Sequence, residues 1–201
     1  TASQDYGQDM NFNKEGFKRI SETYRRFRNT FRFLLGNLNN FDYKKDAVPY
    51  EELLPLDKWA LARLDQLIKT SGEAYDNFEF YKVYHELNQF FVVDLSAHYL
   101  DILKDRLYTW KSEGTDRRSA QTVMYEITQT LMTLMAPMTS FLSEESYQYF
   151  SGKNKESIFM TNFPVSGPNG DHPEWVNEAI TSDFQQLFAL REDVTKQLED
   201  M

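Results

Sequence analysis

The sequence predicts an all-α protein, an antiparallel bundle of five or six helices. Three observations support this prediction. Long stretches of the chain carry apolar residues at alternating steps of three and four, the spacing of one face of an α-helix. Glycine, proline and asparagine residues separate these stretches, as expected where helices end. Most of the links between the expected helices are short, which favours antiparallel neighbours.

Six segments show the helical period. In chain order they are expected at about 17–38, 59–76, 80–107, 117–135, 141–150 and 174–200. Residues 1–12 are polar and without period, so we expect an arm there. Prolines or glycines interrupt the stretches 41–55 and 151–173, which are therefore expected as loops.

The first expected helix, from Phe17 to Leu38, carries an apolar signal and a basic one. Its apolar stripe consists of Phe17, Ile20, Tyr24, Phe27, Phe31, Leu34 and Leu38. Lys18, Arg25 and Arg32 repeat every seven residues and Arg28 falls between them, so the four cations project within one arc beside that stripe. Aromatic residues on such a stripe are core residues far more often than stacking partners for bases.

Single residues give further local expectations. Asn13 is suited to cap the first helix, and Asp57 to cap the second. In the third helix, Asp94 and Ser96 can compete for backbone hydrogen bonds, so a kink or a break is expected there.

Composition limits the function. The chain has 22 basic and 31 acidic residues, a net charge of −9, so any contact with nucleic acid must come from a local basic patch. Residues 1–40 supply one, with seven Lys or Arg against four Asp or Glu. Cysteine is absent and the three histidines lack metal-binding spacing, so no metal site is expected. No apolar run is long enough for a membrane span, and a soluble, cytoplasmic protein is expected.

The chain has no recognisable catalytic motif. It contains no glycine-rich phosphate loop, nucleophile elbow or paired histidines, and its carboxylates, such as Glu144 and Glu145, are typical of solvated helix faces. We therefore expect no enzymatic activity in this chain and assign no catalytic residues. The basic flank of the first helix has two interpretations: a solvated face paired with neighbouring carboxylates, or a stripe that follows a phosphate backbone.

Several segments resemble one protein family. In order, they are YRRFRNTFRFLLGNL, LDKWALARL, FYKVYHELNQFFVVDLSAHYLDILKDRLY, RRSAQTVMYEI, LMAPMTSFLSEESYQYF and SIFMTNFP. Together they closely resemble the anticodon-binding helical domain of bacterial-type isoleucyl-tRNA synthetases, over about residues 5–195. The RNTFRFLLGNL and VVDLSAHYLDILKDRLY segments resemble the isoleucine enzyme in particular. Gly16 and Phe159 depart from the family pattern.

The resemblance implies a tRNA-binding piece of a longer class I synthetase. Residues 1–12 would be the stub from an upstream catalytic domain, 13–165 the anticodon-binding bundle, and 166–201 a loop and helix leading to a downstream module. The parent would attach isoleucine to its tRNA with ATP and magnesium, and would hold zinc in a carboxyl-terminal module. The ATP signatures, the editing domain and the zinc module are all missing from this sequence, so no cofactor is expected here.

The resemblance also assigns candidate site residues. It favours RNA contact by the basic flank and by a later arginine pair, which together are Lys18, Arg25, Arg28, Arg32, Arg117 and Arg118. Asn29, Thr30 and Phe33 are interpreted as the seam to the catalytic domain. Isoleucine tRNA and that catalytic domain are the expected partners of a monomeric fragment. The alternatives are a helical protein-interaction bundle without RNA binding, or the equivalent domain of a valyl- or leucyl-tRNA synthetase.

Overall fold

The computed structural model describes residues 2–9 and 13–199, and all regular structure in these residues is helical. The predicted all-α bundle is confirmed. Its helices are α1 (Lys14–Asn37), α2 (Tyr43–Asp46), η1 (Tyr50–Glu52), α3 (Pro55–Asp76), α4 (Phe80–Gln89), η2 (Phe90–Leu100), α5 (Asp101–Thr109), α6 (Thr115–Met135), α7 (Ser140–Gln148), η3 (Ile158–Met160), η4 (Pro173–Trp175) and α8 (Glu178–Glu199). Thr1 and residues 10–12 of the expected arm, and Asp200 of the last expected helix, lie outside the described residues.

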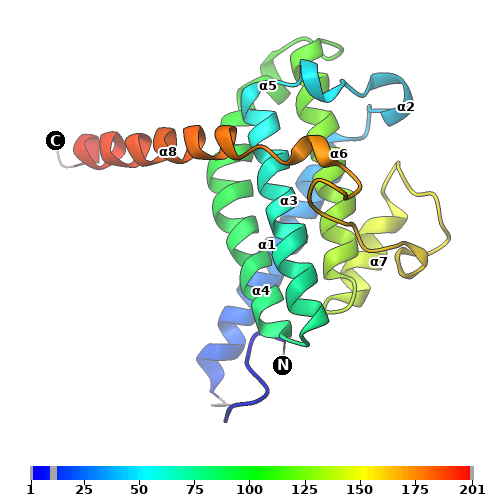
Figure 1. Cartoon of the computed structure of the whole chain (residues 1–201), viewed down its shortest axis with the longest axis vertical. Helices are drawn as coiled ribbons and strands as arrows, with labels where there is room; N and C mark the ends of the chain where they lie inside the picture. The colour runs from blue at the N-terminus through cyan, green and yellow to red at the C-terminus, as the bar shows by residue number, and fades with distance from the viewer. Residues whose placement is uncertain (1, 10–12, 200–201) are drawn as a thin grey trace.

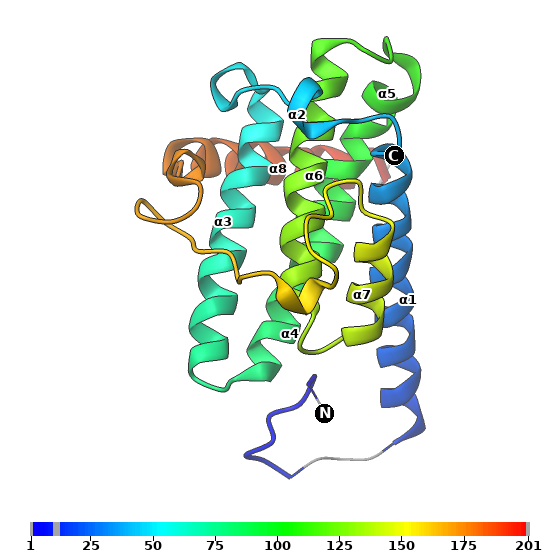
Figure 2. The same ribbon diagram turned by 90° about the vertical axis from the view of Figure 1, so that its right-hand side faces the viewer.

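Helix α6 is the centre of the bundle. It contacts α1, α2, α3, α5 and α7, and α3 packs in turn against α4, η2 and α8 (Figures 1 and 2). Buried residues cover most sides of α6, because it is enclosed by neighbours all round. Burial of this apolar surface is the main source of stability for such a bundle, at about 25 cal/mol for each Å² removed from water.

Helix α1 is divided into an outer and an inner half. At its start, the side chain of Asn13 accepts a hydrogen bond from the Gly16 backbone N–H at 2.6 Å, which confirms the expected cap. The outer half extends past the end of the bundle (Figure 2), and Ile20 and Tyr24 are 40% and 43% exposed. Phe27 and Phe31 on the inner half pack against Phe91 of η2. The expectation of a buried Tyr24 is therefore wrong, because the bundle ends before that turn.

Asp57 is not the cap of the second helix. Helix α3 begins at Pro55, whose missing backbone N–H costs nothing in the first turn of a helix. Asp57 lies inside that turn and is fully buried. Its carboxylate accepts hydrogen bonds from Tyr99, Arg106 and Ser119, with lengths of 2.7, 2.6 and 2.5 Å. The aspartate thus connects α3 to η2, α5 and α6.

The third long helix is continuous but changes type. Between α4 and α5, the chain forms a π-helix, η2, over the stretch where a kink or break was expected. Ser96 Oγ donates a hydrogen bond to the Phe91 carbonyl at 2.6 Å. Asp94 instead accepts two hydrogen bonds from Arg63, at 3.1 and 3.0 Å. The α-helical geometry is thus interrupted at the expected position. The interruption is a wider helix and not a break, because the flanking apolar residues remain buried.

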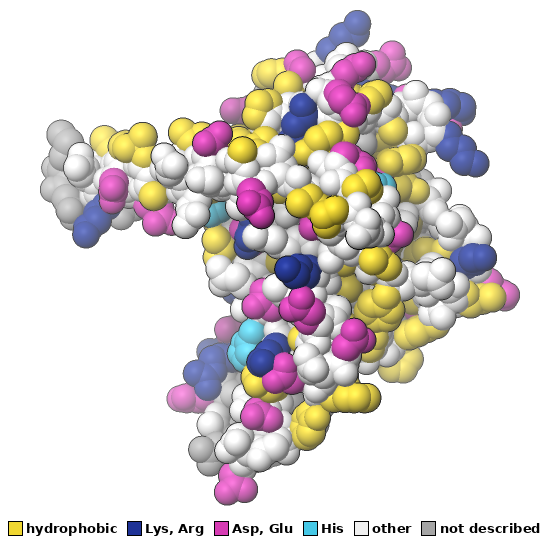
Figure 3. Space-filling view, viewed as in Figure 1, with side chains coloured by type: hydrophobic (Ala, Val, Ile, Leu, Met, Phe, Trp, Pro, Cys, Tyr) yellow, Lys and Arg dark blue, Asp and Glu magenta, His cyan; other side chains and the backbone are white. Residues whose placement is uncertain are grey.

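Helix α8 packs on the bundle with its first half only. Phe184 and Phe188 contact Trp59 of α3, and Phe188 stacks on His98 with ring centroids 3.9 Å apart. The second half projects away from the bundle, and hydrophobic side chains follow its upper edge in Figure 3. On α8, Leu187, Leu190, Val194 and Leu198 are exposed. None of the helices in the described ranges has the length and apolar composition to cross a membrane.

Candidate nucleic-acid interface

The basic flank of α1 is on the surface of the molecule. Lys18, Arg25, Arg28 and Arg32 are all exposed. Arg28 forms an ion pair with Glu145 of α7 at 3.3 Å. Within residues 2–9 and 13–199, the other three form no ion pair. Since an exposed ion pair is worth about 0 to 1 kcal/mol, all four charges are available to an anionic ligand.

Two grooves run along the two sides of α1. The first, which we call the α7 groove, lies between α1 and α7 and has a volume of about 590 Å³. It is lined by Arg28, Phe31, Arg32, Leu35, Gly36, Asn39, Leu142, Glu145, Ser146 and Tyr149. Two of the four predicted cations therefore line the same groove, from successive turns of one helix.

The second groove, which we call the α5 groove, lies between α1 and the η2–α5 helix and has a volume of about 530 Å³. It is lined by Glu22, Arg25, Arg26, Asn29, Thr30, Phe33, Ser96, Leu100, Asp101 and Lys104. The π-helix forms part of this wall, through Ser96 and Leu100. Its three cations face two carboxylates, so the groove carries a positive balance on an acidic protein.

The carboxylate of Asp101 organises the far wall of the α5 groove. It accepts hydrogen bonds from Lys104 at 2.9 Å and from Arg191 of α8 at 3.3 Å. The hydrogen bond from Lys104 is the largest cause that lowers the pKa of Asp101 below its usual value, so this carboxylate stays charged. Arg25 and Arg26 on the opposite wall make no comparable pair among the described residues.

Arg117 and Arg118 line neither groove, and both form contacts within the fold. Arg117 donates to the carbonyls of Leu107 and Ser112, at 3.2 and 2.8 Å. Arg118 donates to the Asn40 carbonyl at 2.8 Å and pairs with Asp46 at 3.4 Å. These contacts close the end of α5 and hold the loop after α1. The structure thus does not bring this pair together with the α1 cations, and their role in RNA binding stays a prediction.

The three residues expected at a domain seam differ in position. Asn29 is exposed, Phe33 is half-buried, and Thr30 is buried at 7% exposure. All three line the α5 groove next to Arg25 and Arg26. Their assignment to a seam stays a prediction, and the structure shows that they share a surface with part of the basic flank.

The groove residues that sequence reasoning did not assign to a site include Arg26, Lys104, Glu145 and Tyr149. Arg26 lies outside the arc of the basic flank, and Lys104 lies on another helix. Glu145 and Tyr149 were missed as well, although they are four residues apart and so share one face of α7. That spacing was the one signal present in the sequence, and it does not reveal which helix faces them.

The arrangement can hold an anion but offers little for catalysis. Five Lys or Arg side chains and several aromatic or amide groups line the two grooves, with no nucleophile next to a base. Within the described ranges there is also no group of three or more His, Cys, Asp or Glu that could hold a metal ion. Cations in shallow grooves, beside exposed planar side chains, are the chemistry of nucleic-acid contact.

Comparison with known proteins gives a family match. The family described as the anticodon-binding domain of tRNA ligase matches residues 57–201. The match begins in α3 and continues past α8. It therefore covers η2, α5 and α7, which line the two grooves opposite α1, but not α1 itself.

Curated relatives extend the match across α1. The chain is 44% identical over 201 residues to the isoleucine–tRNA ligase of Persephonella marina, and 46% identical over 200 residues to that of Caldanaerobacter subterraneus subsp. tengcongensis. It is 47% identical over 199 residues to the enzyme of Caldicellulosiruptor bescii. Each alignment covers 98% of this chain and 21% of the relative. The chain thus spans about a fifth of the length of these relatives.

Proposed function

The chain belongs to the family of anticodon-binding domains of tRNA ligases, and from this premise we propose that it binds the anticodon stem and loop of an isoleucine tRNA. The tRNA would lie against the outward side of α1. Arg25 on one side and Arg28 and Arg32 on the other would contact its phosphates, and Lys18 would extend this track along the outer half of the helix. Arg117 and Arg118 would contribute to the local positive potential.

One observation carries this proposal. A chain with a net charge of −9 places exposed cations along one helix, between two grooves that are open to a ligand. If the charges of such a protein were distributed at random, most of its surface would be negative. The positive charge along α1 therefore favours a polyanionic partner. Phosphate contacts of this kind supply most of the affinity and little of the sequence specificity.

The longer protein would supply the chemistry. Relatives of this chain carry the name isoleucine–tRNA ligase, so the complete protein would join isoleucine to its tRNA. Sites for ATP with magnesium, and for zinc, would lie in its other parts, and this segment would act by binding alone. The bundle at 13–165 would bind the RNA. Residues 1–12 would connect it to the upstream catalytic domain, and residues 166–201 would connect it to a downstream module. Asn29, Thr30 and Phe33 would also meet the catalytic part. The isolated segment would be a monomer, and the protein would be cytoplasmic.

The test is a titration of isoleucine tRNA at two salt concentrations. The variant Arg25→Glu/Arg28→Glu/Arg32→Glu should bind more weakly than the wild type. The slope of log affinity against log salt should flatten by up to about 0.9 for each phosphate that the variant no longer neutralises. Fluorescence anisotropy with labelled tRNA measures both quantities, and circular dichroism checks that the variant is folded.

A control variant separates local binding from net charge. Lys69, Lys111 and Lys155 are exposed residues outside both grooves, and changing all three to Glu alters the net charge by the same amount. This control should keep the wild-type salt slope. Equal salt slopes for the wild type and both variants would show that α1 is not part of the RNA-binding surface. A protein partner captured through α1 after nuclease treatment, with no tRNA binding, would favour an interaction bundle instead.

A further inference from the structure

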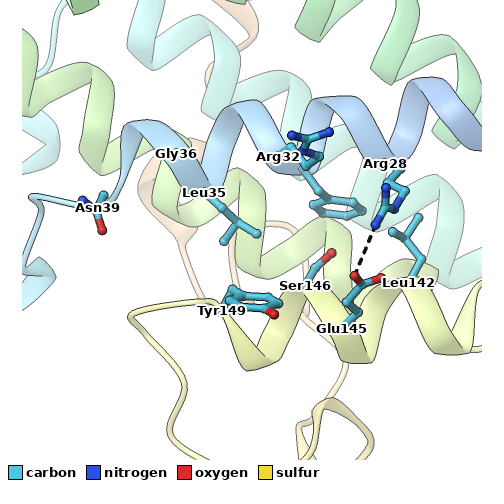
Figure 4. Close-up of a pocket in the computed structure, with 10 residues that line it drawn as sticks. Arg28, Arg32, Leu35, Gly36, Asn39, Leu142, Glu145, Ser146 and Tyr149 are labelled. Atoms are coloured by element: carbon cyan, nitrogen blue, oxygen red, sulfur yellow. Dashed lines mark hydrogen bonds and ion pairs between the residues drawn. The ribbon is translucent and has the colours of Figure 1, made fainter.

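The α7 groove combines two kinds of binding group. Arg28 and Arg32 line it from α1, and Tyr149 lines it from the end of α7, beside Leu35 (Figure 4). Tyr149 is 77% exposed although it lies beside the apolar side chain of Leu35. Gly36 leaves further room, because a Cβ atom there would meet nothing within 4 Å. An exposed planar ring and two arginines that line one groove are suited to a nucleotide, with its base on the ring and its phosphate at the arginines.

Glu145 is the feature that a simple anion site would not have. The Glu145 carboxylate lies in the groove and forms an ion pair with Arg28 at 3.3 Å. The side chain of Arg32 is not turned toward it (Figure 4). The Arg28 and Glu145 side chains are 46% and 52% exposed, so their pair is weak and exchanges readily with solvent. A phosphate that approaches Arg28 must displace this carboxylate and then lies next to its negative charge. Glu145 therefore competes with phosphate for Arg28.

We propose that the α7 groove takes one unpaired nucleotide of the bound RNA, with its base stacked on Tyr149 and its phosphate held by Arg32 and Arg28, and that Glu145 weakens this contact by competing for Arg28. The proposal rests on the function proposed above and adds to it a subsite for single-stranded RNA. Asn39, at the end of the groove near Gly36, is placed to hydrogen-bond the edge of the base. Double-stranded RNA has no free base for the ring and would not use this subsite.

Tyr149 is tested with two RNA probes, a hairpin with the anticodon stem and loop of isoleucine tRNA and a blunt duplex of the same stem. Tyr149→Ala should weaken hairpin binding about fivefold or more, since stacking on an aromatic side chain has about that value. Its salt slope and its binding to the duplex should equal those of the wild type. Tyr149→Phe keeps the ring and should bind the hairpin as the wild type does. Phe141→Ala is the matched control, because Phe141 is a 92% exposed aromatic residue of the same helix that does not line the groove.

Glu145 is tested in the opposite direction, as a gain of affinity. Glu145→Gln should bind the hairpin more tightly at low salt, by about 1.4- to fivefold, because an exposed ion pair of about 0.2–1 kcal/mol no longer competes. The salt slope should become steeper by up to about one, since Arg28 now neutralises a phosphate. Glu113→Gln removes the same charge from a loop outside the groove and should leave the affinity unchanged.

The results separate the two proposals. If the wild type binds the hairpin but Tyr149→Ala binds it equally well, or if Glu145→Gln does not bind it more tightly, the α7 groove is not a nucleotide subsite. The proposed function would then stand on the α5 groove alone. If the wild type binds neither the hairpin nor tRNA, the proposed function itself is overturned. Tyr149 and Glu145 are both exposed, so these variants are expected to fold, and thermal melts followed by circular dichroism verify it.

Discussion

Two arginines of this protein pair with carboxylates in opposite environments. Arg106 and Asp57 are 10% and 0% exposed in their side chains and are separated by 2.6 Å, whereas the Arg28 and Glu145 side chains are 46% and 52% exposed at 3.3 Å. Burial raises the pKa of Asp57, and the guanidinium of Arg106 opposes that rise. In the surface pair, water screens both charges, so their mutual attraction is weak.

The difference in burial separates an ion pair that stabilises the fold from one that is open to a ligand. Asp57 also accepts hydrogen bonds from Tyr99 and Ser119, so its site has no room for another ligand. Glu145 and Arg28 have spare hydrogen-bonding capacity and lie in an open groove. The same two chemical groups therefore hold four helices together in one place and remain exchangeable in the other. Burial and the number of additional donors decide between these outcomes.

The largest effect is expected from breaking the buried pair. Arg106→Leu leaves the Asp57 carboxylate buried without its cation and should lower the free energy of unfolding by about 3–5 kcal/mol. Urea denaturation followed by circular dichroism measures it. The double variant Asp57→Asn/Arg106→Leu should recover part of this loss, because the neutral amide accepts a hydrogen bond from one of the Tyr99 and Ser119 hydroxyls and donates to the other. A double variant as unstable as Arg106→Leu alone would show that the charge of Asp57 is not the cause.

A pair of intermediate exposure should give an intermediate effect. Arg63 binds Asp94 through two hydrogen bonds, and their side chains are 30% and 11% exposed. Arg63→Gln should lower the free energy of unfolding by about 1–2 kcal/mol, because it removes partly buried hydrogen bonds to a charged group within the π-helix. Urea denaturation under the same conditions allows direct comparison. A cost as small as that of a surface pair would break the proposed relation between burial and stability.

The pH dependence offers a smaller and separate test at Glu126. Burial raises the pKa of this carboxyl above its usual value, although a hydrogen bond from Tyr43 opposes the rise. As pH increases from about 4.5 through the raised pKa, the folded state retains a proton that the unfolded state has released, so stability falls in that window. Glu126→Gln keeps an acceptor for Tyr43 and should be more stable than the wild type at pH 7. The two proteins should converge near pH 4 in thermal melts, and a constant difference across this range would argue against the titration of Glu126.

The surface pair should give the smallest change in stability. Arg28→Gln is expected to alter the free energy of unfolding by about 0.5 kcal/mol or less, in line with exposed ion pairs. The same variant should weaken binding to isoleucine tRNA. If its stability loss instead approached that of Arg63→Gln, Arg28 would be a structural residue like Arg106, and the contrast between the two pairs would disappear.

The helices and much of the candidate surface were predictable from the sequence. Periodicity placed every long helix, and the cap at Asn13 was predictable because capping depends on residues three apart. The exposure of Lys18, Arg25, Arg28 and Arg32 followed from their position beside the apolar stripe of α1. Local rules were sufficient for these features, since each concerns neighbours within one helix.

Other features depended on the neighbours that folding brings together. Asp57 has the sequence context of a cap, and only the approach of Tyr99, Arg106 and Ser119 shows that it is a buried acceptor. Tyr24 continues the apolar stripe, yet it is exposed because the bundle ends before it. No local rule states where a neighbouring helix stops.

The sequence by itself determined the all-α class, the order of the long helices, the family resemblance and the positive flank of α1, because these follow from residue spacing along one chain. Only the tertiary structure decided that the flank is divided between two grooves, and that Glu145 and Tyr149 lie opposite Arg28 and Arg32. The α1 and α7 residues are more than a hundred positions apart. Their proximity results from the packing of both helices against α6, which is a property of the whole bundle.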